Sequence, residues 1–362
     1  MKKIGIDARL YFQTGVGVYL RNFLYWLEKE PSEDKFIIYV LEKDQKKIKL
    51  NQKKFILKPV PFYWHTIKEQ IGFYQELIKD KLDLMHFTYF SYPIFYRKKF
   101  IATIHDLTPL FFKTGRASTK NRIYYEMKFF FFKKVIATQI KNAKAIITPS
   151  FTVKKQIISL FGKKLTDKIF PIYEGINFEL EKTNINKDLS TKFKNPFFIY
   201  IGNFYPHKNL ERLIKAYVRI KTNNFLLLIG PEDFFCQKII QLINQLDFRK
   251  KVFVFKNPKI EDLLFFYKNA KALIHPSLAE GFGLPLIEAA HFNLPIIASD
   301  IEIFHEILGD QFLALDPLDE KDIQKKIEQF LVKPLSFDYQ KILPRYSFKK
   351  MTQEIIKLYK II

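Results

Sequence analysis

The sequence has 362 residues, of which 48% are hydrophobic and 17% aromatic, with 60 Lys and Arg against 37 Asp and Glu, a net charge of +23. This apolar content excludes a disordered polyelectrolyte or a collagen-like repeat, and the length predicts two domains of about 100–200 residues each. A single cysteine, Cys236, excludes a disulfide scaffold and a cysteine-cluster metal site. The chain begins with a strand-like run rather than a signal peptide, and no apolar run reaches about 18 residues. We therefore expect a cytoplasmic protein without a membrane-spanning helix.

The positive charge is concentrated in the first half of the chain. Residues 1–190 hold 35 Lys and Arg against 18 Asp and Glu, a net +17, whereas residues 191–362 hold 25 against 19, a net +6. A bias toward Lys codons explains part of this excess, but the asymmetry indicates that the first half faces something anionic. The candidates are nucleic acid, a nucleotide-linked substrate and a phospholipid surface.

Apolar runs alternate with longer amphipathic stretches along the first half. A helix is predicted over about residues 18–27, after a loop with Gly15 and Gly17. Strands that alternate with helices indicate a parallel sheet covered on both faces. The predicted strands are residues 2–7, 35–41, 82–87, 100–104 and 145–148.

A polar stretch at residues 181–195 has no apolar period and is predicted to be an interdomain linker. The alternation of strands and helices then starts again. Strands are predicted at 197–201, 225–229, 252–255, 272–274 and 295–298, and helices at 209–220, 234–246, 260–269 and from near Pro285. We therefore predict two doubly wound α/β halves with a ligand at the carboxyl ends of their strands.

The glycine loop of the first half is tested as a dinucleotide-binding fingerprint. Gly15 and Gly17 fit G-x-G, but Leu20 stands at the third glycine position, and the loop begins about seven residues past the strand. Both features disfavour a nicotinamide site. Two interpretations remain: a loop before a helix N-terminus that receives an anion, and an ordinary surface turn.

Residues 275–290, HPSLAEGFGLPLIEAA, are the most informative stretch. A strand ends in a loop with two glycines, and Pro285 stands where a helix can start. Glu280 lies in this loop and Glu288 one turn inside the helix, so two carboxylates can grip the hydroxyls of a polyol. A single Glu near a helix N-terminus is often only a partner of the helix dipole. The pair around Gly-Phe-Gly favours a ligand site.

This stretch resembles the E-x7-E motif of glycosyltransferase family 4, and the resemblance continues in order along nearly the whole chain. The matching segments are IGIDAR at 4–9, TGVG at 14–17, TIHDL at 103–107, ITPS at 147–150, EGI at 174–176 and IGNFYPHKNL at 201–210. The resemblance implies a GT-B fold, in which two Rossmann-like domains face each other across a cleft. It implies an acceptor-binding domain at 1–185, a nucleotide-sugar-binding domain at 186–340, and a C-terminal helix at 341–362 that packs back on the first domain.

The resemblance also implies roles for individual residues. His105, Glu280 and Lys208 are implied to be catalytic: His105 and Glu280 contact the transferred sugar, and Lys208 binds the donor diphosphate. Glu288 is implied to bind the ribose hydroxyls. The implied donor-binding residues are Gly15, Gly17, Gly202, Asn203, His207, Lys208, Gly281, Phe282, Gly283, Leu284 and Glu288.

One position departs from the family pattern, because His207 stands where members often have Arg. Without the guanidinium, either Lys208 and backbone amides carry more of the phosphate binding, or a protonated His207 shares it. No Asp-x-Asp lies in a setting that suits a metal-held diphosphate, so we expect neither a metal nor another cofactor. The resemblance implies transfer with retention of configuration. We find no carboxylate suited to a covalent sugar intermediate on the first domain, so front-face transfer is favoured over double displacement.

Residues 111–135 hold seven Lys and Arg, one Glu and a run of four Phe. This pattern fits either a buried helix with a solvated basic face or a surface that binds anionic lipid near a glycan or lipid-linked acceptor. The resemblance implies hexosyl transfer from a GDP- or UDP-sugar to a glycan or lipid-linked saccharide in envelope polysaccharide synthesis, and we expect the protein in the cytoplasm or peripherally on the inner membrane face. The alternatives are a sugar-nucleotide epimerase of the same fold and a basic nucleic-acid-binding protein. We expect no nucleic acid partner, because no nucleic-acid-binding motif is found.

Overall fold

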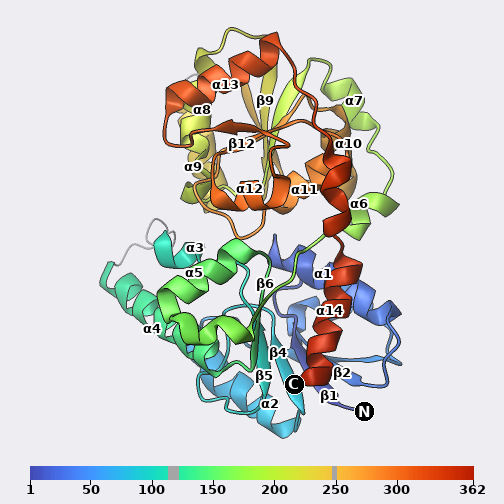
Figure 1. Cartoon of the computed structure of the whole chain (residues 1–362). Helices are drawn as coiled ribbons and strands as arrows, with labels where there is room; N and C mark the ends of the chain where they lie inside the picture. Colours follow the sequence, from blue (N-terminus) through green and yellow to red (C-terminus); the bar gives the residue numbers. More distant parts are fainter. Residues whose placement is uncertain (113–121, 247–250) are drawn as a thin grey trace. The chain divides into compact units, whose positions relative to one another are not determined.

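The computed structural model describes residues 1–112, 122–246 and 251–362, without the side chains of 122–125. The chain forms two compact units: the first contains Met1–Glu174 and Ser347–Ile362, and the second Gly175–Tyr346. In each unit, helices lie on both faces of one parallel sheet (Figure 1). The predicted doubly wound α/β class is therefore confirmed.

The first unit is built on a seven-stranded parallel sheet with the order β3-β2-β1-β4-β5-β6-β7. Its strands are β1 Lys3–Asp7, β2 Lys35–Leu41, β3 Phe55–Val60, β4 Leu84–Phe87, β5 Phe100–Thr103, β6 Ala145–Thr148 and β7 Ile169–Pro171. The chain proceeds outward from β1 on one side and from β4 on the other, so the strand order reverses between β1 and β4. Ligands of such sheets bind at the carboxyl ends of the strands near this switch point.

Helices cover this sheet and bury its apolar side chains. They are α1 Val16–Lys29, α2 Tyr74–Lys79, α3 Thr108–Phe111, α4 Arg122–Asn142, α5 Phe151–Phe161 and α14 Phe348–Ile361, with shorter turns at Glu42–Lys47, Glu69–Phe73 and Lys163–Lys168. The C-terminal helix α14 packs against α1, as the red and blue ribbons in Figure 1 show. Its Tyr359 is 1% exposed and donates or accepts a hydrogen bond at His86 Nδ1 of β4, 2.7 Å away.

The second unit has a six-stranded parallel sheet with the order β10-β9-β8-β11-β12-β13, so its switch point lies between β8 and β11. Its strands are β8 Phe197–Ile201, β9 Phe225–Gly230, β10 Val252–Lys256, β11 Leu273–His275, β12 Ile296–Ser299 and β13 Leu313–Leu315. Its helices are α6 Phe178–Lys182, α7 Asp188–Lys192, α8 Leu210–Arg219, α9 Phe234–Gln245, α10 Ile260–Asn269, α11 Leu284–His291, α12 Glu302–Leu308 and α13 Glu320–Val332, with turns at Pro206–Lys208, Tyr339–Lys341 and Leu343–Arg345.

The segment predicted as a linker, residues 181–195, belongs to the second unit instead. It contains the end of α6 and all of α7, and each helix buries one leucine, Leu180 at 2% and Leu189 at 4% exposure. One buried leucine in a polar stretch is too little to produce an apolar period. The units accordingly divide after Glu174 and Tyr346, rather than after residues 185 and 340 as the sequence suggested.

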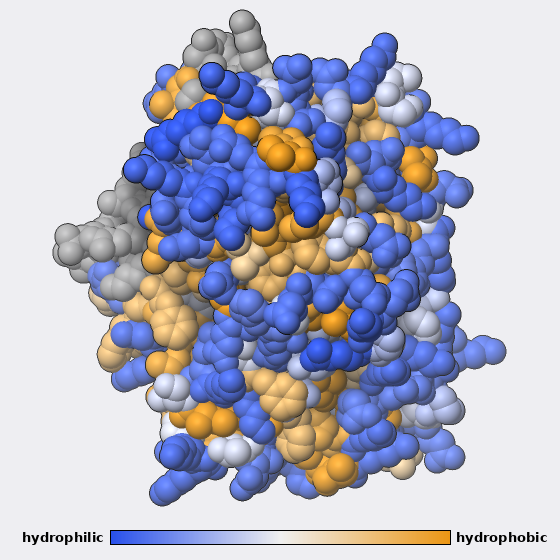
Figure 2. All heavy atoms as spheres, turned by 45° about the horizontal axis from the view of Figure 1, so that its top comes forward, coloured by the Kyte–Doolittle hydropathy of each residue, from blue (hydrophilic) through white to orange (hydrophobic). Residues whose placement is uncertain are grey.

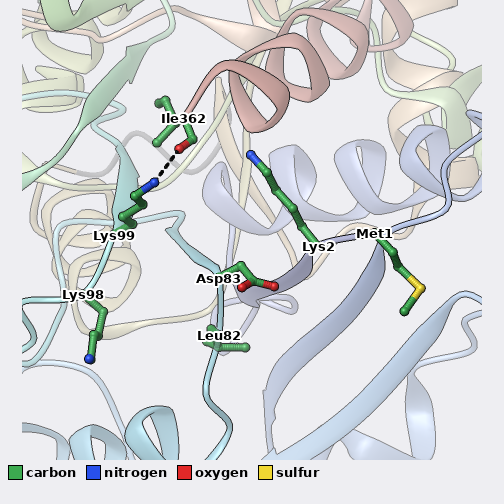
Figure 3. A pocket seen from close by; sticks show the side chains of 7 residues that line it. All are labelled: Met1, Lys2, Leu82, Asp83, Lys98, Lys99 and Ile362. Carbon is green, nitrogen blue, oxygen red and sulfur yellow. Dashed lines mark hydrogen bonds between the residues drawn. The ribbon is translucent and has the colours of Figure 1, made fainter.

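A pocket rich in lysine lies at the amino-terminal edge of the first sheet, where β1, β4 and β5 begin. Figure 3 shows Lys99 Nζ donating to the main-chain oxygen of Ile362 at 3.2 Å across this pocket. Its lining residues are Met1, Lys2, Leu82, Asp83, Lys98, Lys99 and Ile362. The pocket is therefore at the opposite end of the strands from the edge where the sequence predicts a ligand.

Helices within the described ranges include none that is both long enough and apolar enough to cross a membrane. Apolar side chains nevertheless reach the surface, and Figure 2 shows several separate hydrophobic patches, in orange, among hydrophilic side chains.

Candidate functional site

Two loops at the carboxyl edge of the second sheet carry most of the predicted donor-binding residues. They are residues 202–209 after β8 and 276–283 after β11, which flank the switch point. Two hydrogen bonds join the loops: Leu278 N donates to His207 O at 2.8 Å, and Asn209 Nδ2 donates to Pro276 O at 3.1 Å. The predicted residues that these loops gather at one edge are Gly202, Asn203, His207, Lys208, Glu280, Gly281, Phe282 and Gly283.

An ion pair joins the two loops at their charged residues. Lys208 Nζ donates to Glu280 Oε1 at 2.6 Å, and the side chains are 12% and 11% exposed. His275, at the end of β11, is 2.9 Å from the same oxygen through Nε2. A carboxylate oxygen only accepts, so His275 donates. Glu280 therefore receives two hydrogen bonds, one of them from a cation.

These contacts decide the charge of each group. Burial opposes ionisation of Glu280, but the charge of Lys208 and the His275 hydrogen bond outweigh it and hold the pKa of Glu280 well below its usual range. Burial lowers the pKa of His275 despite the opposing effect of Glu280. Near neutral pH the cluster consists of an ionised Glu280, a charged Lys208 and an uncharged His275.

His207, the departure from the family pattern, is 8% exposed. Burial first, and then the charge of Lys208, lowers its pKa to about 4. The ring is therefore uncharged near neutral pH in this structure. This disfavours a protonated His207 that shares phosphate binding, and favours the alternative in which Lys208 and backbone amides carry it.

Glu288 has a different environment from Glu280, although the sequence presented them as a pair. It lies inside α11 at 7% exposure, where Tyr267 Oη of α10 donates to its Oε2 at 2.6 Å. Burial raises the pKa of Glu288 to about 7, the Tyr267 hydrogen bond opposes this rise, and the charge of Glu179 in α6 adds to it. Glu288 consequently changes charge near neutral pH.

The glycines of the two loops allow close backbone packing. Gly283 has φ 102° directly before Leu284, the first residue of α11. At Gly230, the last residue of β9, an added Cβ would lie 2.0 Å from the carbonyl oxygen of Gly202, so the loop after β8 rests on the neighbouring strand. Phe282 is 5% exposed and its ring packs edge-on against Tyr346 at 5.8 Å. Its ring therefore serves the core, and its backbone is the part that can meet a ligand.

The remaining predicted residues lie at the carboxyl edge of the first sheet. His105 follows β5, and its Nε2 is 3.0 Å from the carbonyl oxygen of Thr88, which follows β4. Its Nδ1 is 3.2 Å from Glu174 Oε1. Tyr19, in the first turns of α1, meets the His105 ring edge-on at 4.7 Å. Gly15, with φ 60°, immediately precedes α1, and Gly17 lies in its first turn.

A buried charged cluster fixes the loop between β1 and α1. Arg9 donates to Asp7 Oδ2 at 2.6 Å and to Glu69 Oε1 at 2.7 Å, with all three side chains 1% exposed or less. Ser91 Oγ donates to Glu69 as well, at 2.5 Å. Residues from three segments of the chain thus meet at the start of the loop that follows β1. Sequence reasoning missed Glu69 and Ser91, since both are far from Arg9 in the chain.

Sequence reasoning also missed the groups that support the site. In the sequence, His275 and Glu174 stand only within segments that resemble the family, without a role of their own, and Tyr267 stands in none of these segments. The signal for His275 was present, because a polar residue at the end of an apolar strand, five residues before Glu280, faces the same edge. For Tyr267 no local signal exists, since its partner Glu288 is 21 residues away.

Both halves of the chain match known families. Residues 14–180 match the family described as Glycosyltransferase Family 4, and residues 181–349 match Glycosyl transferases group 1. A similar protein is the O-antigen chain mannosyltransferase RfbU of Salmonella typhimurium, which is 31% identical over 267 residues, 72% of this chain and 73% of that protein.

Solved structures show the same fold at low sequence identity. A sucrose-phosphate synthase from Thermosynechococcus elongatus superimposes with a TM-score of 0.78 at 18% identity, covering 99% of this chain and 98% of that one. The Anabaena protein HepE, in complex with UDP and glucose, superimposes with a TM-score of 0.77 at 14% identity over all of both chains. With two Rossmann-like units of this kind and family matches over both halves, the chain belongs to glycosyltransferase family 4 and has the GT-B fold.

Proposed function

We propose that this glycosyltransferase moves a hexosyl group, with retention of configuration, from a GDP- or UDP-sugar to a glycan or lipid-linked saccharide in envelope polysaccharide synthesis. The cluster of Lys208, Glu280 and His275 carries the proposal. A cation and an ionised carboxylate 2.6 Å apart suit a ligand in which a diphosphate is joined to a hydroxyl-rich sugar. The similarity to RfbU, an O-antigen chain mannosyltransferase, supports a mannosyl donor and an acceptor of the O-antigen kind.

In this proposal each charged group has one task. Lys208 binds the diphosphate, Glu280 accepts hydrogen bonds from sugar hydroxyls, and Glu288 binds the ribose hydroxyls. His105 of the first unit contacts the transferred sugar. His275 holds Glu280 in place, because its Nε2 donates to the oxygen that Lys208 also contacts.

The bond between the anomeric carbon and the diphosphate oxygen breaks, and the acceptor oxygen bonds to the same face of that carbon. The acceptor proton passes to the departing diphosphate oxygen, so no protein nucleophile is required. Lys208 and the backbone N–H groups of the loops stabilise the negative charge that grows on the diphosphate, which is where an electrostatic contribution to the rate is largest. The proposed reaction uses the sugar nucleotide as substrate and requires neither a metal ion nor a cofactor.

The test is transfer from a panel of GDP- and UDP-sugars to lipid-linked and free saccharide acceptors, with NMR of the anomeric configuration of the product. An α-linked product from an α-donor supports the proposal, whereas inversion contradicts retention. Incubation with the donor alone tests the epimerase alternative, because an epimerase changes the donor without an acceptor. A salt-sensitive complex with random DNA, without turnover of any sugar nucleotide, would favour the nucleic-acid alternative.

Activity is expected to survive EDTA. The cation of the proposed phosphate site is Lys208, which is supplied by the chain and held by Glu280. Rates in EDTA and in excess Mg²⁺ should therefore agree within about twofold, since the charge on the leaving diphosphate is stabilised without an exchangeable ion. Loss of activity in EDTA that Mn²⁺ or Mg²⁺ restores would contradict this metal-independent mechanism.

We also propose that helix α4 binds the anionic inner face of the membrane. Residues 113–121 and the side chains of 122–125 lie outside the described residues, so support comes from residues 126–135 of the predicted stretch 111–135. Three large apolar side chains there are more than half exposed, at 57%, 51% and 60% for Met127, Phe130 and Phe131. The surface, which we call the α4 surface, consists of Met127, Lys128, Phe130, Phe131, Lys133 and Lys134.

Vesicle sedimentation tests the α4 surface. Each basic residue near an anionic membrane contributes about 1 kcal/mol, so Lys128→Glu/Lys133→Glu/Lys134→Glu is expected to lower binding to acidic vesicles at least a hundredfold. High salt should release the wild type, because the screening length falls to about 3 Å at 1 M.

The matched control reverses three exposed lysines of the second unit, Lys215, Lys238 and Lys325, with the same change in net charge. If this control loses as much binding, the attraction reflects net charge alone. If the wild type ignores acidic vesicles at low salt, the α4 surface does not bind lipid.

A further inference from the structure

The ring of His105 is held at both nitrogens. The carbonyl oxygen of Thr88, 3.0 Å from Nε2, only accepts hydrogen bonds, so Nε2 carries a hydrogen and donates it. On the other side, Glu174 Oε1 is 3.2 Å from Nδ1. The edge-on contact with Tyr19 at 4.7 Å completes the surroundings of the ring. Two hydrogen bonds at opposite ends of a planar ring leave it no free rotation.

Glu174 is buried for this contact. Its side chain is 6% exposed and the His105 side chain 11%. It follows β7 and is the last residue of the first unit's Met1–Glu174 segment. Burying a carboxyl group is unfavourable unless it is paired, and His105 is the partner that the structure provides at hydrogen-bond distance. Without such a contact, a carboxyl group in a connecting segment is expected to be exposed to solvent.

The other polar groups around His105 are themselves bonded. Tyr19 Oη is 3.2 Å from Thr103 Oγ1, which is 2.8 Å from His86 Nε2. Burial, followed by the effect of His105, lowers the pKa of His86 to about 3, so this neighbour is uncharged. Asp106, the next residue, accepts from the backbone N–H of Thr108 at 2.7 Å. Glu174 is thus the acidic group that contacts the ring itself.

We propose that Glu174 is a positioning residue for sugar transfer: it acts through His105, by holding the ring in the orientation in which it meets the transferred sugar. The inference rests on the proposed function, which assigns His105 to the sugar. Displacement of a group at a reacting centre by about 1 Å can lower the rate by two orders of magnitude. A residue that fixes such a ring therefore affects turnover without touching the substrate.

A double-mutant cycle tests this assignment. Glu174→Ala is expected to lower kcat by about 10- to 100-fold while the donor KM changes by less than about twofold, because the proposed function assigns the diphosphate and the ribose of the donor to Lys208 and Glu288 of the second unit. Glu174→Gln keeps an amide that can bond to Nδ1, through its oxygen where Nδ1 carries a hydrogen and through its NH2 group where Nδ1 does not, and should retain at least about one third of kcat. In a His105→Ala background, Glu174→Ala should change kcat by less than about threefold, since there is no ring left to hold.

Several results would overturn the assignment. If Glu174→Ala lowers kcat as much in the His105→Ala background as in the wild type, Glu174 acts through something other than His105. If Glu174→Gln is as slow as Glu174→Ala, the hydrogen bond to His105 is not the cause of the loss in kcat. If Glu174→Ala does not fold, Glu174→Asp replaces it in the same cycle, because its shorter side chain withdraws the oxygen from Nδ1.

The control is Tyr39→Phe, which removes a hydrogen bond to Asp80 elsewhere in the first unit and should lower stability without lowering kcat. A kcat loss in this control equal to that of Glu174→Ala would reduce the role of Glu174 to general stability. The proposed function is tested separately by the wild-type protein, because a wild type that transfers no sugar contradicts the proposed function whatever the Glu174 variants do.

Discussion

Lys208→Met is expected to lose at least a hundredfold in kcat and about 3–5 kcal/mol in the free energy of unfolding. The rate falls because the leaving diphosphate loses its cation, a loss worth about 10²–10³ for a comparable electrostatic donor. The stability falls because Glu280, with a side chain 11% exposed, keeps its charge and loses its charged partner. Urea unfolding and steady-state kinetics measure the two effects on the same sample. The control Lys215→Met removes an exposed lysine of α8. It should leave kcat nearly unchanged and change the free energy of unfolding by no more than about 0.5 kcal/mol.

The pH dependence of this stability loss identifies its source. In the wild type the native pKa of Glu280 lies below its ordinary value of 4.5, so the ion pair contributes stability above that pH and loses it as the pH falls through the native pKa. Without Lys208, burial dominates and the native pKa of Glu280 rises. The deficit of Lys208→Met is therefore expected to be full at pH 7 and to shrink as the pH falls toward 4.5 and below.

A second variant separates stability from activity. Lys208→Met/Glu280→Gln removes both charges, so it should recover most of the stability and remain inactive. A deficit that is equal at all pH values, or a double variant as unstable as the single one, would contradict the assignment of the ion pair.

Glu288→Gln is expected to stabilise the protein at pH 8 and to weaken nucleotide binding. The native pKa of Glu288 is about 7 against 4.5 when unfolded, so the native state holds this proton more tightly. Wild-type stability therefore decreases as the pH rises from about 4.5 to 7, by about 3 kcal/mol in full. Gln cannot ionise and its amide oxygen still accepts from Tyr267. The gain in stability should be about 1–3 kcal/mol at pH 8 and close to zero at pH 4.5.

Although Glu288→Gln is expected to be more stable at pH 8, it should bind nucleotide more weakly than the wild type. Loss of a charge-assisted hydrogen bond to the ribose costs about 1.5–3 kcal/mol, or about 10- to 150-fold in Kd. Calorimetry with GDP and UDP, beside thermal melts at pH 4.5 and 8, checks both effects. Glu211→Gln, with the same charge change on the exposed face of α8, serves as the control and should leave both unchanged. A Glu288→Gln variant that binds nucleotide as tightly as the wild type would remove Glu288 from the site.

The inner strands of both sheets could be predicted from the sequence, as could the edge strand β10, whereas the edge strands β3, β7 and β13 could not. The runs that became β2, β6 and β8 were predicted with the bounds that the structure has, because a parallel strand covered on both faces is apolar throughout. The sequence analysis did not predict β3, β7 or β13. Strand β3 contains Lys58 and Pro59 and is half-exposed at the edge of the first sheet. Strands β7 and β13 have three residues each, which is too short to show a pattern of alternating apolar residues.

The candidate site was predictable where neighbours in sequence are neighbours in space. Lys208, Glu280 and Glu288 could be selected because glycine, proline and a following helix mark their loops. Their charge states could not, since they depend on burial and on partners such as Tyr267. The pair of Glu280 and Glu288 looked equivalent in the sequence, yet one is ionised against Lys208 and the other titrates near neutral pH.

The return of α14 to the first unit has a consequence for the order in which the chain folds during synthesis. The second unit is one continuous segment, residues 175–346, whereas the first needs residues from both ends of the chain. Until Tyr359 leaves the ribosome, His86 Nδ1 lacks its partner and α1 lacks the helix that packs on it. We therefore expect the second unit to fold to completion first, although its residues are made later than most of the first. The N-terminal sheet would spend the whole of that interval incomplete, with the apolar face that α14 covers still exposed.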